Sequence, residues 1–272
     1  MAANPYTTNL ELELNAKDIS ATDGDSITTW TDSSAAGNDA TQSTSGRRPV
    51  YKTSIIGSHP VVRFTTDSTK SLYGSFASSW SGFGGATVLM LAQFYEIQPI
   101  DNGGIFVLHD GADSDTNSAD NMLLYTGISN NVVNHFSRSQ LNLYYNGSYA
   151  VGGIGTLRPG APSLLGFAMD TSATGVKFIS ELGGYTTSDS FQYTGTPTNF
   201  VLGNRFQSGS VSAVYGYRAD IAMLLIYKEY VSDSNITLVK NWMLSEYDAH
   251  TQSASGGGGL IRSQGMSGGM NG

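Results

Sequence analysis

Short segments in which apolar and polar residues alternate recur along this chain and predict β-strands separated by turns. Leu10, Leu12 and Leu14 alternate with Glu11 and Glu13, the two-residue period of a strand with one buried and one solvated face. Gly, Asn, Asp and Ser mark the turns between such segments, a rhythm typical of an all-β sandwich. Further strands are expected at 27–31, 48–51, 60–64, 71–73, 104–109, 121–126, 131–136, 141–145, 163–170, 175–180 and 200–204.

Two segments, 86–94 and 218–228, are almost continuously apolar. Runs of this length predict central strands that are buried on both faces. Asn146-Gly147 follows the predicted strand at 141–145 and favours a tight hairpin turn, because Asn and Gly accept the positive φ angles that such a turn requires.

One helix is expected near the end of the chain. Ser232 is suited to the N-cap position, and Asp233 follows it at the positive end of the helix dipole. The apolar residues that recur at helical spacing on one face are Ile236, Val239, Met243 and Tyr247, with Trp242 beside them.

Four short motifs follow one another near the start of the chain: LELEL, WTDS, RPVY and GSHPVVRF. Together with the later segment ADIAMLLIYKEYVSDSNITLVKNWMLSEY, they resemble laminin-G-like, concanavalin A-like (lectin–glucanase) modules of the type found in phage structural proteins. The resemblance implies a jelly-roll sandwich of two antiparallel sheets with one short C-terminal helix. We expect residues 1–250 to form this domain and residues 251–272 to form a separate Gly/Ser-rich tail.

Composition narrows the classes of function. Charged residues make up only 13% of the chain, and the net charge is −8. Such a balance argues against nucleic acid as a partner, since phosphate binding requires clustered Lys and Arg. The chain has no cysteine, and no apolar run is long enough to span a membrane. Because its first residues lack the pattern of a secretory signal, either a leader has been removed or the protein leaves the cell by lysis, and we expect the second, a virion component made in the host cytoplasm.

The strongest candidate for hydrolytic chemistry is the pair Glu11 and Glu13. On one face of a strand they would lie about 6.6 Å apart, within the range used by paired-carboxylate glycosidases. The third carboxylate of the glycosidase pattern is absent, because Ala16 stands at its position. We therefore expect a solvated strand face and a protein that is not an enzyme.

The densest group of oxygen ligands lies in the loop that contains Asp113, Asp115 and Asn117. Their alternation is that of a calcium-binding loop, but Ser118 and Leu124 stand where such a loop has its Gly and its bidentate Glu. The loop is thus a weak calcium candidate, and a polar solvent loop is the alternative. The histidines lack the spacing of a zinc site.

Tyrosines close to turns offer a second kind of site, because their rings present an apolar face and a polar tip. The candidates for stacking on a glycan are Tyr144, Tyr145, Tyr193, Tyr215 and Tyr217. The alternative is that tyrosine is simply a favourable strand residue.

The tail at 251–272 is dominated by Gly and Ser and by itself should be a flexible coil. Its residues with side chains suited to docking on another subunit are Leu260, Ile261, Arg262, Met266 and Met270. The leading hypothesis is a non-enzymatic virion protein, namely a bacteriophage capsid decoration, head-fibre or tail-associated subunit that binds other virion subunits or copies of itself. A lectin or adhesin that recognises surface glycans is the alternative, and a polysaccharide-cleaving enzyme of the same fold is a weaker third hypothesis.

Overall fold

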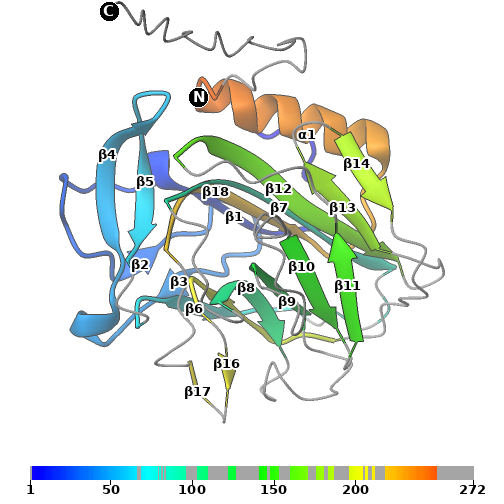
Figure 1. Ribbon diagram of the computed structural model, residues 1–272, viewed down its shortest axis with the longest axis horizontal. Helices are drawn as coiled ribbons and strands as arrows, with labels where there is room; N and C mark the ends of the chain where they lie inside the picture. Colours follow the sequence, from blue (N-terminus) through cyan, green and yellow to red (C-terminus); the bar gives the residue numbers. More distant parts are fainter. Residues whose placement is uncertain are drawn as a thin grey trace, which may run out of the picture.

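The computed structural model describes most of the chain outside the tail (Figure 1). The described residues are 2–65, 69–78, 80, 82, 84–95, 103–109, 122–126, 141–145, 148–152, 160–170, 176–180, 183–186, 196–204, 206–207, 210–211 and 218–249. The backbone but not the side chains is described in strands β9, β10, β11 and β14 and at Gln207 and Ser210. Two antiparallel eight-stranded sheets and one α-helix account for most of the regular secondary structure among these residues, which confirms the predicted jelly-roll sandwich.

The first sheet, called sheet A, has the strand order β14-β13-β12-β7-β18-β5-β4, and β1 also pairs with β18. Its strands are β14 (Gly183–Thr186), β13 (Val176–Ser180), β12 (Pro162–Asp170), β7 (Gly85–Phe94), β18 (Ala219–Tyr227), β5 (His59–Phe64), β4 (Val50–Ile56) and β1 (Leu10–Asn15).

The second sheet, called sheet B, has the strand order β11-β10-β9-β8-β15-β6-β3-β2. Its strands are β11 (Ser148–Gly152), β10 (Leu141–Tyr145), β9 (Met122–Thr126), β8 (Gly103–His109), β15 (Asn199–Leu202), β6 (Leu72–Ser75), β3 (Ala40–Thr41) and β2 (Thr29–Trp30). A separate hairpin, β16 (Phe206–Gln207) and β17 (Ser210–Val211), lies beyond sheet B on the side away from the helix (Figure 1).

The two long apolar segments form β7 and β18, which pair with each other at the centre of sheet A, as predicted. Their side chains alternate between two apolar layers. Val88 and Met90 of β7 face the core between the sheets, whereas Leu89 and Leu91 face the opposite layer. Because both faces are covered, no polar alternation is needed, which explains the continuous apolar sequence.

The second apolar layer lies between sheet A and the predicted helix, α1 (Asp233–Glu246), which covers the outer face of that sheet (Figure 1). Ser232 is the N-cap and its side chain accepts a hydrogen bond from the backbone N–H of Asn235, as its position in the sequence predicts. Ile236, Val239 and Met243 are buried against the sheet.

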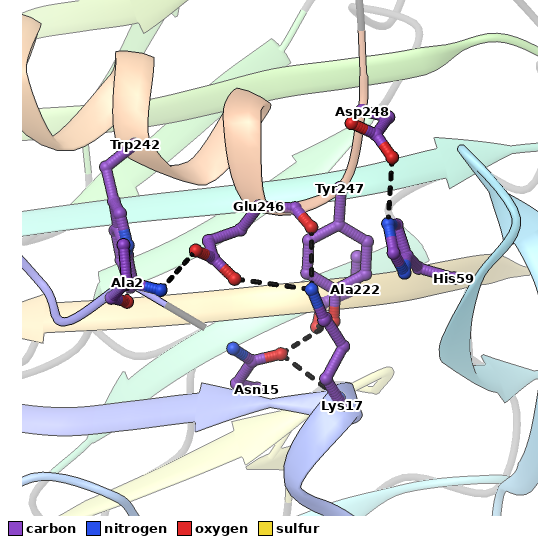
Figure 2. A network of polar contacts seen from close by, with 9 residues as sticks. All are labelled: Ala2, Asn15, Lys17, His59, Ala222, Trp242, Glu246, Tyr247 and Asp248. Atoms are coloured by element: carbon purple, nitrogen blue, oxygen red, sulfur yellow. Dashed lines mark hydrogen bonds and ion pairs between the residues drawn. The ribbon is translucent and has the colours of Figure 1, made fainter.

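The C-terminal end of α1 is anchored by a network of polar contacts (Figure 2). The Lys17 ammonium donates to the backbone carbonyl of Glu246 at 2.8 Å and to its carboxylate at 3.2 Å. A cation at this position is stabilised by the negative end of the helix dipole. The buried Tyr247 hydroxyl lies 2.7 Å from Asn15 Oδ1 and 2.8 Å from the carbonyl of Ala222. These bonds tie the helix to β1 and β18, so the network serves the fold.

The structure corrects the expectation that Leu10, Leu12 and Leu14 share one face. The pairing of β1 with β18 shifts register between Leu10 and Leu12. Leu12 and Leu14 therefore lie in the core between the sheets, while Leu10 packs in the layer beneath α1. A bulge of this kind moves every following side chain to the opposite face.

Other strand predictions differ from the structure at their ends. The strand expected at 27–31 is reduced to Thr29–Trp30, and the one expected at 131–136 lies outside the described residues. In β10 and β11, Tyr145 pairs with Ser148, which leaves two residues to connect them, as the Asn146-Gly147 motif predicts. The short strands β3, β14, β16 and β17 have no clear sequence pattern and were not predicted.

Candidate functional site

A hollow of about 380 Å³ lies on the outer face of sheet B. This volume is near the lower end of the range for small-molecule sites, about 300–1,000 Å³. Strands β6, β8 and β15 form the floor of the hollow. The 42–47 segment and the β16–β17 hairpin form its walls. Because these elements come from distant parts of the chain, only the folded sheet creates the site.

The register of sheet B determines which side chains reach the hollow. Tyr73 of β6 pairs with Val201 of β15, and Val201 pairs with Val107 of β8. Paired residues in a sheet share a face, so these three side chains form one row on the outer face. Their neighbours in sequence point inward; Leu72 and Phe200, for example, are fully buried in the core between the sheets.

A second row lies two residues further along the same strands. Asn199 of β15 pairs with Ser75 of β6 on one side and with His109 of β8 on the other. The ring of His109 is buried and stacks on Phe206 of the hairpin, with 4.0 Å between ring centroids and 18° between ring planes. This stacking fixes the hairpin wall beside the floor.

The polar side chains around the hollow differ in what they already bind. Gln42 is buried: its amide nitrogen donates to Ser71, and its oxygen accepts the backbone N–H of Thr44. Asn199 accepts from the Ser75 hydroxyl at 2.7 Å. These residues therefore position the wall and floor.

Tyr73 has a different environment. Its side chain is 38% exposed, and its hydroxyl makes no hydrogen bond within the described part of the chain. A partly exposed aromatic ring with an unpaired hydroxyl group is suited to a ligand that has both an apolar and a polar face. A strand was expected at 71–73, but Tyr73 was not among the predicted site residues, although its alternation with the apolar Leu72 signals an outward side chain.

The tyrosines proposed from the sequence are only partly placed. Tyr144 and Tyr145 lie on β10, four strands from β6 in the same sheet, but their side chains are not described. Tyr193, Tyr215 and Tyr217 lie outside the described residues.

The other proposed sites also lie outside the described residues. This holds for the calcium candidates Asp113, Asp115 and Asn117 and for the tail residues Leu260, Ile261, Arg262, Met266 and Met270. Among the side chains that are described, no group of three or more His, Cys, Asp or Glu is placed to hold a metal ion. In the same part of the chain, no helix combines the length and apolarity of a membrane span.

The solvated carboxylate face predicted for Glu11 and Glu13 is wrong. Glu11 is only 3% exposed, forms an ion pair with Lys228 and accepts the Ser78 hydroxyl at 2.9 Å. Glu13 is partly buried and accepts from the Asn4 amide at 3.1 Å. The bulge in β1 separates their surroundings, and neither carboxylate lines the hollow.

Burial has a measurable consequence at Glu13. Desolvation raises the pKa of its carboxyl group, and the nearby carboxylates of Asp18 and Asp32 act in the same direction. The hydrogen bond from Asn4 opposes this shift only in part. Glu13 is thus a carboxylate held in a partly apolar environment on the helix side of β1.

A second polar cluster lies where β5 and β18 pair. Arg63 donates two hydrogen bonds of 2.8 Å to the fully buried carboxylate of Asp220. The guanidinium groups of Arg63 and Arg218 each lie 4.9 Å from the ring centroid of Tyr95. Burial, followed by the contact with Asp220, raises the pKa of Tyr95 to about 12. These groups satisfy one another, so the cluster is an ion-pair network of the fold.

Comparison with solved structures finds the same fold in proteins of very different sequence. One is a mutant of Trypanosoma rangeli sialidase displaying trans-sialidase activity, with a TM-score of 0.57 and 11% identity over 92% of this chain and 35% of the sialidase. Another is the botulinum neurotoxin serotype D binding domain, with a TM-score of 0.57 and 8% identity over 87% of this chain and 51% of the other.

The receptor binding domain of the botulinum neurotoxin C/D mosaic serotype is similar as well, with a TM-score of 0.54 and 9% identity over 86% of this chain and 51% of that one. This chain therefore spans about a third of the sialidase and about half of each toxin domain. No protein-family model matches the sequence. No curated protein matches it either. At these identities the likeness establishes the fold alone, a β-sandwich of two sheets.

Proposed function

We propose that this protein is a lectin-like carbohydrate-binding module and that the hollow on sheet B is its ligand site. The observation that carries the proposal is the position of Tyr73, half-exposed and with a free hydroxyl, on the floor of a hollow that has one polar and one apolar wall. A sugar ring has an apolar C–H face and a hydroxyl edge, which match the face and the tip of a tyrosine. One of the similar toxin domains is named a receptor binding domain, which supports a recognition role.

The proposal is binding without hydrolysis. Glycoside hydrolysis uses a pair of carboxylates on either side of the scissile bond. Among the described lining residues there is no Asp or Glu, and Glu11 is engaged by Lys228. The sialidase likeness covers only about a third of that enzyme, so its activity is not carried over to this chain.

Binding to an immobilised panel of oligosaccharides, followed by titration of the retained sugars, tests this function. Tyr73→Ala is expected to weaken binding at least about tenfold, equivalent to about 1.4 kcal/mol. Tyr230 provides the matched control, because it is 36% exposed but does not line the hollow. Tyr230→Ala should bind like the wild type. Retention of no oligosaccharide by the wild type, or equal binding by Tyr73→Ala, would refute the proposal.

The sequence supports a second candidate function, that of a virion structural protein, specifically a phage capsid decoration, head-fibre or tail-associated subunit. The supporting observation is the Gly/Ser-rich segment 251–272 with its few apolar side chains and one arginine, which is suited to docking on another subunit. Deleting residues 251–272 should abolish incorporation into particles while leaving oligosaccharide binding intact. Unchanged incorporation of the truncated chain would contradict the tail-docking hypothesis. A glycan-binding domain displayed on a particle would combine both functions.

A further inference from the structure

The described lining of the hollow contains one charged residue, Arg47. Arg47 is the only Lys, Arg, Asp or Glu among the described residues that line it. Arg47 ends the short helix η2 (Ser45–Arg47), and its backbone is held at both ends: its N–H donates to Thr44 and its carbonyl accepts from Ser71. The position of the side chain at the rim is therefore set by the fold.

The guanidinium of Arg47 differs from the neighbouring cation in what it binds. Arg48 donates to the carbonyls of Gln42 and Ser43, each at 3.0 Å, and thereby holds the wall segment in place. The Arg47 side chain makes no hydrogen bond or ion pair within the described structure. Its five N–H donors are thus available to a ligand.

Two hydroxyl groups near Arg47 can also donate hydrogen bonds to a ligand. The hydroxyls of Thr44 and Tyr73 form no hydrogen bond in the part of the chain that is described. A site that combines an unpaired guanidinium with hydroxyl donors favours a ligand rich in acceptors and negative in charge. Guanidinium groups bind carboxylate, sulfate and phosphate through paired, charge-assisted hydrogen bonds.

We infer that the hollow selects an acidic saccharide, whose carboxylate or sulfate group pairs with Arg47 while its ring lies against Tyr73. This inference rests on the proposed carbohydrate-binding function and adds the class of sugar. The protein carries 22 acidic and 14 basic residues, so Arg47, which has no acidic side chain beside it among the described lining residues, is a local exception that would attract an anion.

The test compares a uronic-acid oligosaccharide with its carboxyl-reduced analogue, which differs only in the charged group. The wild type is expected to bind the acidic form at least about tenfold more tightly at low salt, and the preference should shrink as salt screens the pair. Arg47→Gln should lose this preference and retain binding of the reduced form. Arg218→Gln, which removes the same charge away from the hollow, should preserve the preference. Thermal unfolding of each variant verifies that it is folded.

The outcomes separate the two proposals. Equal binding of the two sugars by the wild type, or an undiminished preference in Arg47→Gln, overturns the inference and leaves carbohydrate binding standing. Failure to bind either of these sugars or any other oligosaccharide refutes both. Inorganic sulfate and phosphate are used as competitors: complete displacement at concentrations equal to that of the sugar would mean a simple anion site and would overturn the inference. Displacement only at a large excess supports recognition of the saccharide.

Discussion

Replacing Asp32 by alanine is expected to destabilise the protein by about 3–6 kcal/mol, because this carboxylate completes the free edge of β1. It accepts the backbone N–H of Glu13 at 2.8 Å, where a neighbouring strand would otherwise bind. It also accepts the backbone N–H of Asn38 at 2.7 Å and two bonds from Ser34. Asp32 is only 7% exposed, so water cannot readily replace it.

The magnitude follows from the two hydrogen bonds that Asp32 accepts from the backbone N–H groups of Glu13 and Asn38. A hydrogen bond to a charged group contributes about 1.5–3 kcal/mol, and leaving a buried N–H unpaired costs a similar amount. The two bonds from Ser34 are local and are counted as nearly neutral, because water or the unfolded chain can satisfy them. The loss is a large part of the roughly 5–15 kcal/mol that stabilises a typical domain.

Urea unfolding followed by tryptophan fluorescence measures this loss, since Trp30 is fully buried two residues away. Asp25→Ala is the matched control. Asp25 also accepts hydrogen bonds from a backbone N–H and a hydroxyl, but both come from Thr22 in an exposed turn. Its loss should cost less than about 1 kcal/mol. If Asp32→Ala costs no more than Asp25→Ala, the explanation of Asp32 as the partner of the β1 edge is wrong.

Three other substitutions test the polar groups of sheet A in the same unfolding assay. Tyr247→Phe should cost about 1–2 kcal/mol, because it removes the buried hydroxyl that contacts Asn15; an unchanged midpoint would contradict this. Glu13→Gln should raise the free energy of unfolding at pH 7. The pKa of the Glu13 carboxyl is raised in the folded state, so the stability that its protonated form contributes is present below the unfolded-state pKa and is lost as pH rises through the folded-state pKa. The gain should disappear below about pH 4, where the carboxyl is protonated in both states, and a gain that persists there would refute the electrostatic cause. Asp220→Ala should cost about 3–5 kcal/mol because it leaves Arg63 without its bidentate partner; a loss below about 1 kcal/mol would argue against the pair.

The predictions that succeeded depend on neighbours in the sequence. The apolar run at 86–94 indicated a strand covered on both faces, and β7 lies at the centre of sheet A beneath α1. The Ser232 cap and the helical spacing after it identified α1, which begins at Asp233. Alternation, capping and turn preferences are local properties, so they can be recognised before any tertiary contact is known.

The prediction for Glu11 and Glu13 was wrong for a physical reason. Strict alternation places both on one solvated face, but the register shift opposite β18 and the ion pair with Lys228 arise only when distant segments pair. A bulge has no reliable sequence signal, because the extra residue has no required type. The same holds for the short strands, whose pairing depends on neighbours elsewhere in the chain.

The sequence by itself determined which segments form the long strands and where the C-terminal helix lies, because the period of the apolar residues restricts each segment to one kind of element. Only the tertiary structure decided where a ligand site lies. The hollow joins Arg47, Tyr73, His109, Asn199 and Phe206. The register of sheet B aligns Tyr73, His109 and Asn199, the stacking on His109 holds Phe206, and the backbone bond from Ser71 holds Arg47. Register is a property of paired strands, so no single segment carries the information that places these five side chains around one site.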